Sequence, residues 1–185
     1  AIFRNATQHS HVLSVSGGSD FTNYYFSLGF SDQDGISVAN SLRRYTFRAN
    51  IDQKVNKWLK IGFSSGISRQ ENYGPLTGSN NLSGNTYAAM RMMPNVPVYD
   101  VNDPTGYNLD SINPRTLGRG ANRIEIANGL PNQRFVLDND LRKAINTRLL
   151  GNVYGAVGLL KGLTFRTQVG IDGNYVDDYL FQDPR

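Results

Sequence analysis

The residues best suited to chemistry are two histidines and a short acidic segment near the start of the chain. His9 and His11 stand two positions apart, so on a strand both imidazoles would point to the same side and could hold a metal ion. The segment Asp32–Gly35 reads "DQDG" and is similar to the start of a calcium loop, but the glutamate that closes such a loop is absent. We predict a turn there, and no metal site at the histidines, because no third ligand stands near them.

Two pairs of acidic residues have the side chains that glycoside cleavage uses: Asp138 with Asp140, and Asp177 with Asp178. That reaction depends on the separation of the carboxylates in space, which their spacing along the chain does not give. The two histidines stand in no context typical of a catalytic triad. We predict that the chain is not an enzyme and that it needs no cofactor.

The composition excludes several other classes of protein. The chain has 185 residues and no cysteine, which excludes a disulfide scaffold and a thiolate metal site. Its net charge is +4, but the basic residues are scattered, so we predict no nucleic-acid partner. No run of apolar residues approaches the roughly 18 that a membrane-spanning helix needs. The 19 glycines, 10 tyrosines and 9 phenylalanines favour strands and turns over helices.

Six segments have the period-two alternation, or the composition, of β-strands. In one of them, Tyr45 and Phe47 alternate with Arg44, Thr46 and Arg48. The predicted strands cover about 11–18, 23–31, 43–52, 58–69, 146–159 and 163–175. The fold class is therefore all-β, an antiparallel meander of about six strands.

The connections between these strands are alternately short and long, and the longest covers residues 70–145. Outer-membrane β-barrels have this asymmetry, with tight periplasmic turns and long extracellular loops. In a barrel the apolar side of each strand faces lipid and the polar side lines the lumen. The predicted lipid-facing residues are Phe26, Leu28, Phe47, Ile61, Phe63 and Phe165. The predicted lumen-facing residues are Arg44, Arg48 and Arg166, which could guide an anionic or polyhydroxyl substrate, pair with carboxylates of a plug, or simply build the wall.

Aromatic residues beside the short connections are consistent with a periplasmic girdle formed by Tyr24, Tyr25 and Trp58. Six strands are fewer than the smallest known barrel, and unpaired strand edges are not tolerated in lipid. The chain is therefore expected to be part of a larger barrel. The alternative is a soluble all-β carbohydrate-binding or adhesion module that buries the apolar side in a sandwich.

The long connection is predicted to be a functional loop, because idle loops of this length are uncommon. A short helix is expected over about Asn85–Met93, which Pro94 ends. Four tyrosines have the flat apolar ring and hydroxyl group that suit contact with a sugar or a partner surface. They are Tyr73, Tyr87, Tyr99 and Tyr107, and the alternative is that they pack the loop onto itself.

Several segments together resemble the barrel of the SusC/RagA-type TonB-dependent transporters of Bacteroidetes. They are "SVSGGS", "TNYYFSLGF", "DQDGI", "RYTFRANID" and "NKWLKIG" in the first seventy residues, and "MRMMPNVPVYD" in the loop. The resemblance implies a 22-stranded barrel in the outer membrane, filled by an N-terminal plug that carries a TonB box. It also implies a SusD-like lipoprotein over the extracellular side, and TonB-driven import of glycans or peptides.

Residues 1–185 are then expected to be a partial barrel domain that follows the plug, because neither a plug nor a TonB box is recognisable in them. The implied partners are the SusD-like lipoprotein, TonB acting through other parts of the protein, outer-membrane lipid, and the substrate. Besides the soluble module, a pore without energy coupling is an alternative to the importer.

Overall fold

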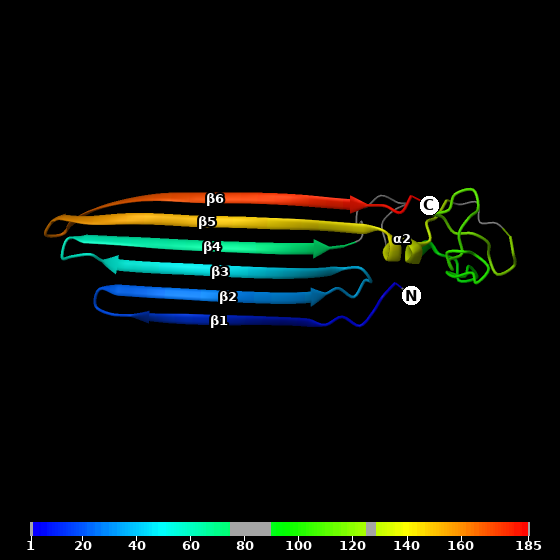
Figure 1. The fold of residues 1–185 in the computed structure, drawn as a ribbon, viewed down its shortest axis with the longest axis horizontal. Coiled ribbons are helices and arrows are strands. Elements are labelled where there is room, and N and C mark those ends of the chain that lie inside the picture. Colours follow the sequence, from blue (N-terminus) through cyan, green and yellow to red (C-terminus); the bar gives the residue numbers. More distant parts are fainter. Residues whose placement is uncertain (1, 75–89, 125–128, 185) are drawn as a thin grey trace.

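The computed structural model describes residues 2–74, 90–124 and 129–184, and it contains one six-stranded antiparallel sheet. The strands pair in the order in which they follow along the chain, as predicted. They are β1 (Gln8–Gly18), β2 (Thr22–Asp34), β3 (Ser41–Lys54), β4 (Leu59–Tyr73), β5 (Leu141–Leu160) and β6 (Leu163–Phe181). Figure 1 shows them as long arrows that lie side by side in one layer and alternate in direction, with β1 and β6 at the two edges.

Short turns join the strands at one end of the sheet, and longer connections leave from the other (Figure 1). The short turns are residues 19–21, 55–58 and 161–162, where Gly162 takes the left-handed conformation with a φ of 86°. The longer connections are residues 35–40 and 74–140, and both chain termini lie at this end. We call these two ends of the sheet the turn end and the loop end.

The strands extend further toward the loop end than the alternation alone indicated. The largest differences are in β6, which ends at Phe181 instead of near residue 175, and in β5, which begins at Leu141 instead of near residue 146. The interpretation of Asp32–Gly35 as a turn is wrong, because Asp32, Gln33 and Asp34 are the last three residues of strand β2. Each aspartate has an arginine partner, Arg43 for Asp32 and Arg4 for Asp34, and these pairs favour the extended backbone.

Buried apolar residues gather in the long connection rather than on the sheet. Val96, Leu117 and Leu130 form a small core, against which Met92 packs. The short helix α2 (Gln133–Asn139) contributes the buried side chains of Phe135 and Leu137. The loop therefore folds as a compact unit with its own core at the loop end of the sheet.

Two buried asparagines hold this loop together. Asn132 caps α2 by accepting from the backbone N–H groups of Arg134 and Phe135, and its amide donates to the carbonyl groups of Val98 and Asn108. The Asn108 side chain in turn donates to the carbonyl groups of Pro97 and Arg119 at 2.8 Å. These bonds join segments that are far apart in the sequence, so they fix how the loop is folded.

The helix predicted over Asn85–Met93 is only partly within the described residues. Met90 and Arg91 are helical and the helix ends there, whereas residues 85–89 lie outside the described part of the chain. Helix α2 was not predicted. Within the described ranges, none of the helices has the length and apolar character needed to cross a membrane.

Candidate functional site

Strand pairing sorts the side chains of the sheet onto two chemically different faces. One face, which we call the apolar face, carries the even-numbered residues of β2 and the odd-numbered residues of the other strands. The opposite, polar face carries the remaining residues. Leu28 stands opposite Phe47, and Phe63 stands opposite both Ile51 and Val153. All six predicted lipid-facing residues lie on the apolar face, and all three predicted lumen-facing arginines lie on the polar face.

The height of the apolar face matches a membrane. On β3 its side chains Tyr45, Phe47, Ala49 and Ile51 are bounded by Arg43 at one end and Gln53 at the other. The ten residue steps between these two residues rise about 34 Å along the strand. A strand tilt of about 40° reduces this to about 26 Å, close to the apolar band of about 25 Å on outer-membrane barrels.

A belt of ion pairs and tyrosines crosses the apolar face at its loop end. Arg43 pairs with Asp32 at 3.1 Å, and Glu71 pairs with both Arg69 and Lys143. The belt also contains Tyr45, Tyr73, Tyr175 and Tyr179. Aromatic and charged side chains are typical of the two membrane–water interfaces. This belt was not predicted from the sequence, although charged residues at apolar-parity positions near the strand ends indicate it.

The aromatic girdle predicted at the turn end is only partly possible. Tyr24 lies on the apolar face, and Trp58 is exposed in the turn before β4. Tyr25 pairs with Asn50 and so lies on the polar face. The prediction for Tyr25 is wrong because neighbouring strand residues point to opposite sides.

The polar face combines small residues with charged ones. Tyr154 donates to Asp52 at 2.6 Å, and the Arg166 guanidinium lies 4.0 Å from the centre of the Tyr154 ring. Gly62 makes this contact possible, because a Cβ atom there would overlap the ring. Arg148 binds Asp172 through two hydrogen bonds of 2.8 and 3.1 Å. The small residues thus leave room for larger polar side chains to reach across the strands.

Three of the four predicted contact tyrosines are described, and they do not form one site. Tyr99 and Tyr107 stack with their ring centres 5.5 Å apart, and Tyr99 is 55% exposed. Tyr107 packs edge-on against Phe135 and donates to Asp138 at 2.7 Å, so it contributes to the loop core. Tyr73 lies at the end of β4 beneath the ammonium group of Lys143. Tyr87 lies outside the described residues.

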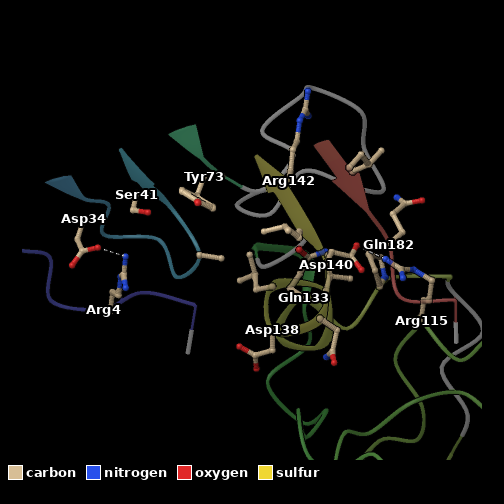
Figure 2. A pocket seen from close by; sticks show the side chains of 18 of the residues that line it. Arg4, Asp34, Ser41, Tyr73, Arg115, Gln133, Asp138, Asp140, Arg142 and Gln182 are labelled. Atoms are coloured by element: carbon tan, nitrogen blue, oxygen red, sulfur yellow. Dashed lines mark hydrogen bonds and ion pairs between the residues drawn. The ribbon is translucent and has the colours of Figure 1, made fainter. Parts of the chain in front are cut away.

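A cavity of about 640 Å³ lies between α2 and the loop end of the sheet. Figure 2 shows Gln133, Asp138 and Asp140 from α2 and its C-terminal end, Tyr73 and Ser41 from the sheet, and the Arg4–Asp34 pair on the far side. Its volume is in the range of ligand pockets. Gln133 is 1% exposed, and its amide nitrogen has no hydrogen-bond partner among the described residues.

The loop residues around this cavity are held by charges. Asp140, just after α2, accepts from Arg115, and Arg115 also donates to the backbone carbonyl of Asp183 after β6. Asp138 accepts from Arg134 at 2.7 Å. This hydrogen bond to Asp138 is the main cause of the raised pKa of Arg134, whereas burial is the main cause of the raised pKa of Tyr107. The loop is thereby tied to the ends of β5 and β6.

The remaining residues weighed for chemistry are not assembled for it. Asp177 and Asp178 project from opposite faces of β6, so these two carboxylates cannot act on one bond. Asp138 and Asp140 each have an arginine partner, which suits a structural role. His9 and His11 do lie side by side, with ring centres 5.5 Å apart, near the loop end of the edge strand β1.

Known proteins similar in sequence share one description. The chain is 29% identical over 177 residues to TonB-dependent receptor P3 of Formosa agariphila, which covers 91% of the chain and 16% of that receptor. It is 29% identical over 123 residues to TonB-dependent receptor SusC of Bacteroides thetaiotaomicron, which covers 62% of the chain and 11% of the receptor. No protein-family model matches the chain.

The fold is similar to that of solved structures of the RagAB peptide importer. The importer in its open-open state superposes with a TM-score of 0.72 at 21% identity, covering 94% of this chain and 18% of the other. The closed-closed state gives 0.70 at 22% identity, covering 98% and 19%. At these identities the likeness shows the fold. The chain spans less than a fifth of the length of each of these proteins.

Proposed function

We infer that this chain is a segment of the barrel wall of a SusC/RagA-type TonB-dependent transporter, and we propose that the protein containing it imports glycans or peptides across the bacterial outer membrane. One observation carries the proposal: the sheet separates an apolar face, about 26 Å high on β3, from a mainly polar face. In this function the apolar face contacts lipid, the polar face lines the lumen, and the folded loop lies outside the cell.

The soluble alternative is disfavoured by the shape of the sheet. A β-sandwich needs a second sheet to cover its apolar side. All six strands in the described part of the chain belong to one sheet, and large apolar side chains such as Phe63 and Val153 remain exposed on it. Lipid is a natural solvent for such a surface, whereas water would favour aggregation.

The name of the RagAB peptide importer and the SusC similarity support a partnership with a SusD-like lipoprotein and a peptide or glycan substrate. The cavity beside α2, with Tyr73 and Gln133 in its lining, lies at the loop end, and we propose that the substrate or the lipoprotein approaches from this side. Energy coupling through TonB would require parts of the protein other than these residues.

Two measurements test this function. An epitope inserted between Val101 and Asn102, both exposed in a turn of the long connection, should be removed by protease added to intact cells. Uptake of oligosaccharides or peptides should stop in a strain that lacks the protein, and also in one that lacks TonB. An epitope protected until lysis would refute the surface location, and uptake that continues without TonB would instead indicate a passive pore.

A further inference from the structure

The polar face carries an excess of positive charge along its whole length. Its basic residues are Arg44, Arg48, Lys54, Lys60, Arg142, Arg148 and Arg166, and its acidic residues are Asp52, Asp172 and Asp178. The excess is therefore 7 − 3 = 4 positive charges. The charge is not spread evenly over both faces, because the belt on the apolar face contains nearly matched ion pairs.

Two of the three acidic residues are already engaged. Asp172 is held by Arg148 through two hydrogen bonds, and Asp52 accepts from Tyr154. Asp178 lies near the loop end, opposite Ala144. The carboxylates of this face therefore do not neutralise its other cations.

Arg48 is an exposed cation of this face without a charged neighbour. Its neighbours across the ladder are Ser27 and Gly66, neither of which has a charge or the length to cover it. The space above Gly66 is open, since a Cβ atom there would touch nothing within 4 Å. Among the described residues, Arg48 has no hydrogen-bond or ion-pair partner. A guanidinium group in this setting is ready to bind a carboxylate or sulfate in the forked geometry that it favours.

Other arginines continue this surface toward both ends of the strands. Arg44 lies four residues from Arg48 on β3, a rise of about 13 Å, and its only described side-chain partner is the neutral amide of Gln70. Arg142 lies at the loop end of β5. Arg166 lies near the turn end of β6, stacked on Tyr154. These four arginines, Arg44, Arg48, Arg142 and Arg166, form what we call the arginine track.

We propose that the arginine track binds the acidic groups of the imported substrate as it passes along the lumen, so that the substrate is an oligomer carrying carboxylate or sulfate groups. Several weak sites at successive depths suit passage better than one strong site, because each must release what it binds. This inference rests on the proposed import function. The same anionic chemistry could come from carboxylates of the protein's own lumen-filling domain, and the experiment distinguishes these sources.

The test uses the complete transporter, purified in detergent, and the single variant Arg48→Gln. Three probes are titrated: an oligogalacturonate, a poly-glutamate peptide and the neutral maltohexaose. We expect at least one acidic probe to bind, with an affinity that falls as salt is raised. Arg48→Gln should weaken that binding by about threefold to tenfold. The control Arg123→Gln removes the same charge from the loop and should leave the affinity unchanged.

Two outcomes would overturn the inference. One is binding of maltohexaose in preference to both acidic probes. The other is unchanged affinity of Arg48→Gln for the acidic probe that the parent protein binds. If the melting temperature of Arg48→Gln is lower in that second case, Arg48 pairs with the protein's own carboxylates instead of the substrate. A separate measurement tests the import function itself. If that function is wrong, cells that lack the protein should take up every probe as well as the parent cells do.

Discussion

Replacing Phe47 with arginine tests the assignment of the two faces most directly. Phe47 lies on the apolar face between Leu28 on β2 and Ile67 on β4. Thr46 precedes it on the same strand and projects from the polar face. The two substitutions Phe47→Arg and Thr46→Arg therefore place the same charge at nearly the same depth, on opposite sides of the sheet.

The expected cost follows from the depth of Phe47. It lies four residues from Arg43 in the charged belt, which corresponds to about 10 Å below that belt for a strand tilted by about 40°. This is near the middle of an apolar band of about 25 Å, where an arginine on the lipid side costs about 2–4 kcal/mol. The folding equilibrium should change by roughly 30- to 700-fold. Arginine at position 46 would project into a watery lumen and should have little effect.

The assay is urea unfolding of the complete barrel in lipid vesicles, followed by tryptophan fluorescence and by the gel shift of the folded barrel. The reasoning is refuted if Phe47→Arg folds like the parent protein while Thr46→Arg does not, since the faces would then be reversed. Equal effects of both substitutions would also refute it, because the sheet would not separate lipid from water.

Three further predictions concern the folded loop. Asn132→Ala removes the cap of α2 and one of the two donors to each of the carbonyl groups of Val98 and Asn108, so the loop should lose about 1–3 kcal/mol of stability and become sensitive to protease. Gln133→Met should stabilise the loop and slow its proteolysis, because it replaces a buried amide whose nitrogen has no partner among the described residues. Faster cleavage of Gln133→Met would show that this amide is hydrogen-bonded in solution. Burial and the hydrogen bond to Asp138 raise the pKa of Tyr107, so its stabilising effect is complete below the ordinary value of about 10 and is lost as the pH rises through the raised pKa. Near-ultraviolet circular dichroism between pH 9 and 12 should show this loosening in the parent protein, and a curve unchanged by Tyr107→Phe would contradict it.

The sheet could be predicted from the sequence because the patterns that form it lie within short stretches of the chain. Alternation at Tyr45–Arg48 assigns each side chain to a face without reference to any other strand. Pairing only had to bring the matching faces together, and the short turns leave little choice of register. The strand ends were less predictable: Asp32 and Glu71 do not read as strand residues, and they are extended here beside cationic partners on neighbouring strands.

The loop was less predictable because its order depends on distant contacts. The amide of Asn132 donates to Val98, which is 34 residues away in the sequence. Nothing near Asn132 in the chain indicates that partner. Helix α2 is only seven residues long, too short to be stable without packing, and its buried Phe135 depends on Tyr107 and the loop core. The cavity beside Gln133 likewise exists only once the loop has folded onto the strand ends.

By itself the sequence determined the fold class, the two faces of the sheet, the alternation of short and long connections and the resemblance to a transporter family. These follow from period-two patterns and turn residues, which act over a few positions. Only the tertiary structure decided which side chains meet: the charged belt, the Tyr154–Asp52 contact across Gly62, and the lack of a described partner for Arg48. The physical reason is that contacts between strands and within the long loop join residues that no local pattern connects.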